Sequence, residues 1–177
     1  DQGFVDFNRV YVGPLEKRGL FADEENPVAR SNVCPELRKP AGPSFEAFTY
    51  TVPALQGALS PQFVIAGSGE AQEGPGTYEE RTIRHGDTST DAMREKAAFV
   101  LDAMEARMAA LGVSWADSVI TQTYTVFDLY PFVADAMAAR GAIDHGLTWY
   151  YARPPVQGLD FEMDVRAVAE EVTMAAE

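Results

Sequence analysis

The clearest pattern of hydrophobic and polar positions lies near the C-terminus, over residues 159–168. Apolar and charged side chains alternate there with a period of two, which is typical of a β-strand with one buried face. The apolar face would carry Leu159, Phe161, Met163, Val165 and Ala167, and the other face Asp160, Glu162, Asp164 and Arg166. This charged row is either an ordinary solvated face or the place where one carboxylate has its acidity tuned in a pocket.

Similar patterns predict the other elements. Alternating or apolar segments predict strands over 4–12, 45–52, 62–68, 119–127 and 147–153. Helical spacing predicts one helix that starts at residues 88–91 and ends at Gly112, and a second over 128–140 that Asp128 caps and Gly141 ends. The side chains of the first helix expected to face the core are Met93, Ala97, Val100, Leu101, Met104, Met108 and Leu111.

The order of these elements predicts the fold class. From residue 45 onward it is strand, strand, helix, strand, helix, strand, strand, which indicates an α+β domain whose mixed sheet has two helices on one face. The other face would carry threonine-rich and acidic positions beside Trp149 or Tyr150, so we expect it to be buried against another subunit.

Residues 1–44 are less regular and contain charged and Pro-containing pieces. We interpret them as an N-terminal arm or the end of a preceding domain, and residues 45–177 as the α+β domain. The start at Asp1 instead of Met suggests a fragment or a processed product. If the arm is the tail of an upstream repeat of the same fold, the assembly would be pseudo-symmetric.

Composition and charge narrow the class of protein. The 177 residues, 46% hydrophobic, are enough for one packed core. A formal net charge of −13 argues against nucleic acid and anionic membranes as partners, although a local Arg can still bind a small anion. The single Cys34 and the two histidines argue against a disulfide framework and a metal site. No apolar run approaches the roughly 20 residues of a membrane helix, and no signal peptide opens the sequence, so we expect a cytoplasmic protein.

Several segments together resemble the reactive-intermediate imine deaminase family, also called RidA or YjgF, over roughly residues 40–170. They are residues 42–45, 64–68, 111–119, 128–132, 151–155 and 161–164. The resemblance implies a chorismate-mutase-like subunit in a trimer with pockets between subunits. It also implies hydrolysis of enamines and imines to ketones and ammonia without a cofactor. The family's conserved glutamate, which activates or orients the attacking water, falls on Glu162, whose neighbours Asp160 and Asp164 would raise its proton affinity.

The sequence departs from this family at the residues that bind the substrate carboxylate. Aligned without gaps backward from Glu162, the family's substrate-binding Arg falls on Gly146, beside His145. A gapped alignment places Arg153 there instead; we prefer the first because it keeps residues 147–153 as a full strand. His145 is then either a loop histidine or a proton donor to the departing amine.

Other side chains could replace the missing contact. Three arginines are candidates for a carboxylate, each with a surface or structural role as the alternative. The step at Gly67 lets a backbone approach a ligand closely, and an aromatic run could cover a flat conjugated substrate. The candidate substrate-binding residues are Arg30, Arg153, Arg166, Ser68, Trp149 and Tyr150.

We therefore predict a cofactor-independent hydrolase that deaminates an enamine or imine acid, with Glu162 and His145 as catalytic residues. The rebuilt pocket resembles relatives that act on 2-aminomuconate or 2-amino-5-chloromuconate. The expected partners are a small carboxylate substrate and further copies of the chain in a homotrimer or a pseudo-trimer. Two alternatives are a non-catalytic ligand-binding member of the same family and a chorismatase-like enzyme, which residues 84–87 resemble in a His-x-Gly-Asp stretch.

Overall fold

The computed structural model of the chain describes residues 2–22, 26–53 and 61–174. The helices are α1 (Gln2–Glu16), α2 (Tyr78–Arg81), α3 (Thr90–Leu111), the 3-10 helices η1 (Trp115–Asp117) and η3 (Ala138–Arg140), and the π-helix η2 (Val133–Met137). The strands are β1 (Cys34–Pro35), β2 (Phe63–Gly69), β3 (Ile120–Tyr124), β4 (Thr148–Tyr150), β5 (Ala152–Arg153) and β6 (Glu162–Ala167). Within these ranges, no helix has the length and apolar character needed to cross a membrane.

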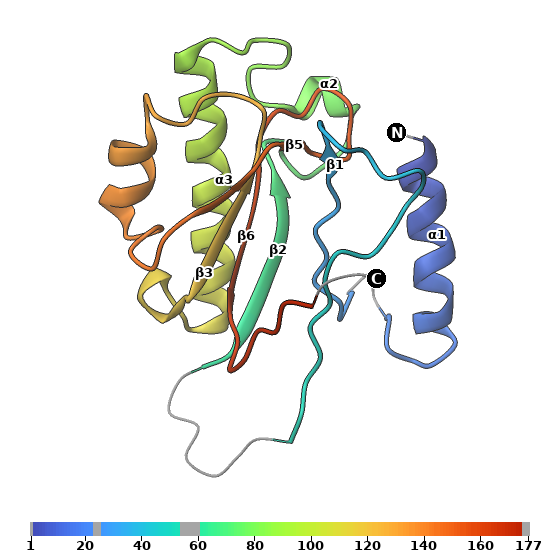
Figure 1. The fold of residues 1–177 in the computed structure, drawn as a ribbon. Helices are drawn as coiled ribbons and strands as arrows, with labels where there is room; N and C mark the ends of the chain where they lie inside the picture. Colours follow the sequence, from blue (N-terminus) through green and yellow to red (C-terminus); the bar gives the residue numbers. More distant parts are fainter. Residues whose placement is uncertain (1, 23–25, 54–60, 175–177) are drawn as a thin grey trace.

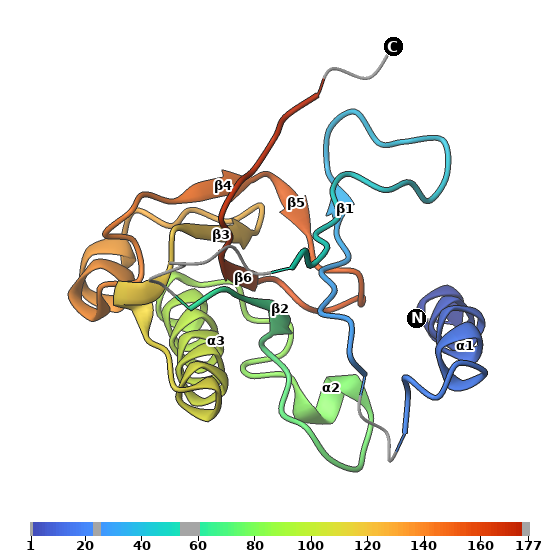
Figure 2. The same cartoon turned by 90° about the horizontal axis from the view of Figure 1, so that it is seen from below.

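Four strands form the main sheet, in the order β2-β6-β3-β4. β6 is antiparallel to both of its neighbours, whereas β4 runs parallel to β3. Helix α3 lies along one face of this sheet with the short helical turns of residues 133–140 beside it, and the segment that contains β1 lies on the other side (Figures 1 and 2). This confirms the predicted α+β class, the mixed sheet and the helices on one face.

Helix α3 supplies more residues of the core than any other described element, and its start and end are as predicted. The Ser89 hydroxyl accepts a hydrogen bond from the backbone N–H of Ala92, and Gly112 ends the helix in the left-handed conformation. Six of the seven side chains expected to face the core are buried. Leu111 is the exception at 58% exposed, because it is the last helical residue before the chain turns at Gly112.

Two segments predicted as strands are not strands. Residues 4–12 belong to α1, because Phe7 and Tyr11 lie four positions apart and so share a helix face, with their rings stacked at 6.1 Å. Residues 45–52 have no strand partner among the described residues, and Phe45, Phe48, Tyr50 and Val52 are exposed there. Their alternation needs a sheet edge to pair with, and β2 pairs only with β6 in the described chain.

The predicted strand over 147–153 is divided between two sheets. β4 pairs with β3 in the main sheet, whereas β5 pairs with β1 of the N-terminal arm. The chain changes partner at Tyr151, whose backbone oxygen accepts from the N–H of Glu36. The continuous strand that favoured the gap-free alignment is therefore absent.

The second helix begins later than predicted. The Asp128 carboxylate accepts from the backbone N–H of Tyr130 and so closes a turn, and Pro131 follows. Regular helix starts only at Val133, as a π-helix that continues into a 3-10 turn. Phe132 and Met137 nevertheless reach the core as expected.

The threonines of β3 face the helices, contrary to prediction. Thr121 stands opposite Val165 and Thr123 opposite Met163, so they share the core face of β6. The other face carries Gln122 opposite Asp164 and Tyr124 opposite Glu162. An alternating pattern separates two faces of a strand, but it does not say which face meets the helices.

The arm covers part of this second face within the same chain. The Ser31 hydroxyl donates to the Asp164 carboxylate at 2.9 Å, and β1 pairs with β5 a few residues later. Gly67 makes the close approach of the arm feasible: its φ is +57°, and a Cβ built there would lie 2.6 Å from the backbone oxygen of Arg30. The domain boundary at residue 45 stays a prediction, although residues 30–36 pack on the sheet.

We expect Gly67→Ala to destabilise the protein more than Gly86→Ala does. Gly86 also has a positive φ, +75°, but a Cβ there meets nothing within 4 Å, so that variant carries only the left-handed strain of about 1–2 kcal/mol. Gly67→Ala adds the clash with the Arg30 backbone, which we expect to cost a further ~1–3 kcal/mol. Urea denaturation of both variants measures the difference; equal losses would mean that the arm does not press on Gly67.

Candidate active site

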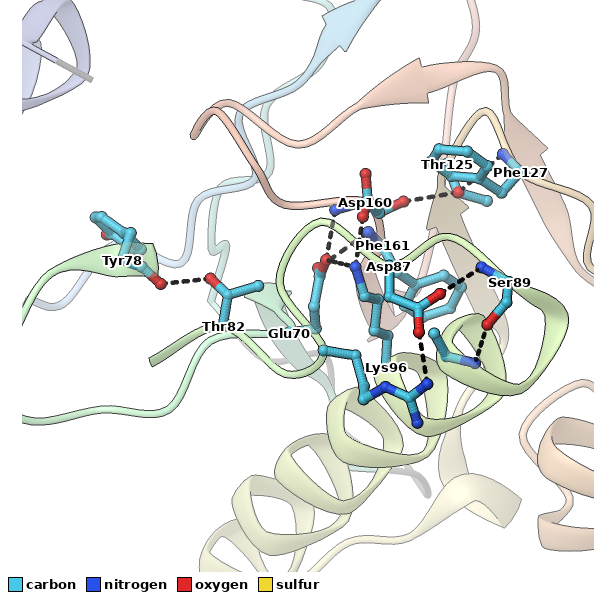
Figure 3. A network of polar contacts seen from close by, with 12 residues as sticks. Glu70, Tyr78, Thr82, Asp87, Ser89, Lys96, Thr125, Phe127, Asp160 and Phe161 are labelled. Atoms are coloured by element: carbon cyan, nitrogen blue, oxygen red, sulfur yellow. Dashed lines mark hydrogen bonds and ion pairs between the residues drawn. The ribbon is translucent and has the colours of Figure 1, made fainter. Parts of the chain in front are cut away.

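A buried ion pair fixes the start of β6. The Lys96 ammonium of α3 donates a hydrogen bond to the Asp160 carboxylate and lies 3.6 Å from the Glu70 carboxylate. Glu70 in turn accepts from the backbone N–H groups of Asp160 and Phe161 (Figure 3). The Asp160 backbone oxygen accepts from the hydroxyl of Thr125 at 2.7 Å. Both the side chain and the backbone of Asp160 are thus held just before the strand begins.

Because of this network, Asp160 does not belong to the row of charged side chains that was predicted to include Glu162. Asp160 points to Lys96 on the helical side of the sheet, so it does not stand beside Glu162 in the strand. Burial raises the pKa of the Glu70 carboxyl group, whereas the N–H groups of Asp160 and Phe161 and the Lys96 charge act in the opposite direction. Glu70 and Lys96 are both fully buried.

Glu162 is a buried carboxyl group on the non-helical face of the sheet. It is 4% exposed, and its burial is the largest cause of a pKa raised to about 8. The negative charges of Asp164 and Glu70 raise it further, and the Arg30 charge lowers it. The predicted increase in the proton affinity of Glu162 is therefore present. Besides Asp164, however, the negative charge that raises it belongs to Glu70 and not to Asp160.

Asp164 is tied into a polar network beside Glu162. Its carboxylate accepts from the hydroxyls of Tyr124, at 2.6 Å, and Ser31, and it lies 3.4 Å from the Arg166 guanidinium. Burial raises the pKa of Asp164, whereas these hydrogen bonds lower it. The same burial and the Asp164 charge raise the pKa of the Tyr124 hydroxyl well above its usual range, so it stays a proton donor.

A cavity of about 200 Å³ opens beside Glu162. Its wall is built from segments far apart in the sequence: the arm, the end of β2, α2, α3 and the loop before β6. The polar side chains of the wall are Arg30, Asn32, Ser68, Gln72, Glu73, Tyr78, Arg81, Arg107 and Glu162. Three guanidinium groups outnumber the two carboxyl groups, Glu73 and Glu162, so this cavity is suited to an anionic ligand.

Of the predicted residues, Glu162, Arg30 and Ser68 meet at this cavity. The Arg30 guanidinium lies 5.1 Å from the Phe7 ring centroid and 4.9 Å from that of Tyr11, and it donates to the Asn8 side chain. Helix α1 therefore holds Arg30 in place. Ser68 lies at the end of the register shift between Ile65 and Ser68 in β2 and lines the cavity.

The other predicted residues lie outside the cavity wall. His145 is exposed in the turn after η3, and Arg153 pairs with Glu36 at 3.0 Å. Arg166 donates to Gln122 at 2.7 Å and pairs with Glu171 at 2.8 Å. Trp149 and Tyr150 are partly exposed; the first donates to the Thr125 backbone and the second stacks on Tyr124. Arg84, in the chorismatase-like stretch, pairs with Asp87 and Glu95.

Three further residues of the cavity wall, Arg81, Arg107 and Asn32, are not predicted from the sequence. Arg107 donates to the backbone oxygen of Ala66 at 3.2 Å, a contact across the irregular part of β2 that periodicity does not reveal. The Asn32 side-chain oxygen is buried without a hydrogen-bond partner in the described part of the chain. A buried acceptor in a cavity wall marks a place where a ligand or water N–H or O–H can bind.

The site combines a buried carboxyl group that can exchange a proton near neutral pH with guanidinium groups that bind anions, which is typical of acid–base enzymes acting on acidic substrates. The family model for "2-aminomuconate deaminase CnbZ" matches residues 1–172, so the chain belongs to that family. It is 49% identical over 174 residues to the 2-amino-5-chloromuconate deaminase of Comamonas testosteroni, a match that covers 98% of this chain and 69% of that protein. The specific resemblance predicted from the sequence is thus confirmed.

Two solved structures match parts of the chain at low sequence identity. A member of the YjgF/YER057c/UK114 family from Mycobacterium tuberculosis is 18% identical, with a TM-score of 0.42, covering 62% of this chain and 80% of that one. A Thermotoga maritima protein described as a candidate endoribonuclease is also 18% identical, with a TM-score of 0.47, covering 83% of this chain and 100% of that one.

We expect Lys96→Met to be strongly destabilising. It would leave the Glu70 and Asp160 carboxylates buried without their cation, and breaking such a pair costs about 3–5 kcal/mol. Urea denaturation at pH 7 measures the loss, and Glu70→Gln added to Lys96→Met should recover part of it. Lys17→Met, at an exposed position, is the control and should change stability by no more than about 0.5 kcal/mol.

We expect the stability gained by Glu162→Gln to grow with pH. The folded-state pKa of Glu162, about 8, lies above its unfolded value of 4.5, so the folded state retains this proton between the two values while the unfolded chain loses it. Wild-type stability from this group is therefore present below pH 4.5 and is lost as the pH rises through 8; glutamine has no such loss. Thermal melting at pH 5, 7 and 8.5 tests this, with the exposed Glu170→Gln as control. A melting difference independent of pH would show that Glu162 titrates normally.

Proposed function

We propose that this protein is a cofactor-independent hydrolase that deaminates enamine acids of the 2-aminomuconate type, with 2-amino-5-chloromuconate as a candidate substrate. Membership of the CnbZ family and the 49% identity to a 2-amino-5-chloromuconate deaminase support the substrate class. One structural observation carries the proposal: Glu162, a buried carboxyl group with a raised pKa, faces a cavity that three guanidinium groups also line. Such a cavity is suited to a substrate that carries carboxylates and needs a proton to react.

The pKa of Glu162 decides the order of proton transfers. Because it is raised to about 8, the carboxyl group is mostly protonated at neutral pH and can act first as an acid. It donates its proton to the enamine carbon next to the amino-bearing carbon, which turns that amino-bearing carbon into an electrophilic iminium. The resulting carboxylate is then the base for the next step.

Water completes the hydrolysis. Glu162 accepts a proton from water as the water oxygen bonds to the iminium carbon, and it passes that proton to the amino nitrogen. The C–N bond breaks, ammonia leaves, and the hydroxyl proton returns to Glu162 as the carbonyl forms. The products are the 2-oxo acid and ammonia, and the enzyme ends in its starting protonation state.

Neighbouring side chains support this assignment. Arg30 acts electrostatically on Glu162 and so lies where it can hold the carboxylate next to the reacting carbon. The unpaired Asn32 oxygen in the same wall can accept an N–H of the amino group. In this proposal, His145 is not needed within one chain; a catalytic role for it would require a neighbouring copy to bring it to the cavity.

The assembly and location of the protein are part of the proposal. We infer a homotrimer or pseudo-trimer, as the sequence resemblance implies, and the exposed apolar side chains of residues 45–52 provide a surface for such contacts. We also infer a cytoplasmic location, which agrees with the lack of a membrane-spanning helix in the described ranges.

Ammonia release from 2-aminomuconate and 2-amino-5-chloromuconate tests the function. We expect Glu162→Gln to lower kcat by about 10²–10⁴-fold, because both the acid and the base are lost, while Glu170→Gln keeps the wild-type rate. The wild-type kcat/KM should fall as the pH rises through about 8, where Glu162 loses the proton it must donate. Equal rates for wild type and Glu162→Gln would remove Glu162 from the chemistry, and binding without turnover would favour a non-catalytic member of the family.

A further inference from the structure

Arg81 is a cation in the cavity wall that two contacts hold in place. Its guanidinium donates to the backbone oxygen of Gln72 at 2.6 Å and lies 4.7 Å from the ring centroid of Tyr78. Among residues 2–22, 26–53 and 61–174, no carboxylate forms an ion pair with it, and its Nε is buried without a hydrogen-bond partner. An Nε–H that is buried without an acceptor is costly, so its presence beside a cavity points to an anionic ligand.

The other two guanidinium groups of the cavity already have roles. Arg107 donates to the Ala66 backbone and lies 3.6 Å from the Glu73 carboxylate. Arg30 packs on two rings of α1, and its charge acts on Glu162. Arg81 comes from α2 and Glu162 from β6, and both face the same cavity. Arg81 is therefore the guanidinium group best placed to bind an anionic group away from the reacting carbon.

The substrate of the proposed function, on which this inference rests, has a carboxylate at each end of a conjugated six-carbon chain. One carboxylate is attached to the amino-bearing carbon and would stay with Arg30 near Glu162. We propose that Arg81 binds the remote carboxylate and so selects dicarboxylates over monocarboxylates. A guanidinium can bind a carboxylate through two parallel N–H groups, which fixes direction as well as charge.

A merely structural role for Arg81 makes a different prediction. If it served only to hold Gln72 and Tyr78 in place, its loss would weaken all ligands of the cavity alike. If it binds the remote carboxylate, its loss weakens only ligands that have one. Two unreactive ligands separate these cases, because trans,trans-muconate and sorbate share the same six-carbon trans,trans diene and differ only in that sorbate has a methyl group where muconate has its second carboxylate.

Isothermal titration of the full chain with trans,trans-muconate and with sorbate is the test. We expect the wild type to bind muconate at least about tenfold more tightly, and Arg81→Met to weaken muconate about 10–100-fold while sorbate stays within about twofold. Arg94→Met is the matched control, because its guanidinium also donates to a backbone oxygen, that of Pro131 at 2.9 Å, but lies outside the cavity wall. It should leave both affinities unchanged.

Several outcomes would overturn the inference: a wild type that binds muconate no better than sorbate, or an Arg81→Met that weakens both ligands equally or neither. If Arg81→Met does not fold, Arg81→Lys takes its place, since it keeps a positive charge and a donor for Gln72; it should weaken muconate about tenfold without affecting sorbate. The result is separable from the proposed function. Muconate selectivity that depends on Arg81, without ammonia release, would overturn the deaminase alone, and deamination with unchanged selectivity in Arg81→Met would overturn this inference alone.

Discussion

The ion pair between Lys96 and the carboxylates of Glu70 and Asp160 holds three segments of the core together. They are the loop after β2, the first half of α3 and the loop that leads into β6, which are far apart in the sequence. An ammonium group in a protein core is tolerated only when its charge is matched and its hydrogen bonds are made. Glu70 also satisfies backbone donors, because its carboxylate accepts hydrogen bonds from the N–H groups of the two residues before β6.

The same ion pair influences the candidate catalytic group. Glu70 raises the pKa of Glu162 across the strand, so a residue that organises the core also sets the protonation state of the cavity. Burial alone would already raise this pKa, and the negative charges of Glu70 and Asp164 add to it. A charge that takes part in the core ion pair thus also influences the pKa of the candidate catalytic group.

What could be predicted from the sequence was what neighbouring residues determine. The alternation from Glu162 to Ala167, the helix start at residues 88–91 and the helix end at Gly112 are local signals, and the structure confirms them. Lys96 could not be predicted, because a lysine on an amphipathic helix normally faces water and only the distant Glu70 and Asp160 make it a core residue. Arg81 and Arg107 were missed for a similar reason: their positions depend on the backbone oxygens of Gln72 and Ala66, which the fold presents and the pattern does not show. The packing of the arm could not be predicted because it depends on a few local contacts, such as Ser31 with Asp164 and the two-residue pairing of β1 with β5, and not on a periodic face.

The complete cavity wall forms only while residues 30–36 pack on the sheet. Arg30 and Asn32 reach the cavity only while this segment is docked, so the wall exists in the fraction of molecules in which the docking contacts are formed. The apparent affinity of any ligand that uses those two side chains is reduced by that fraction, and the ligand in turn stabilises the docked segment. Ligand binding in the cavity and docking of residues 30–36 on the sheet consequently stabilise each other.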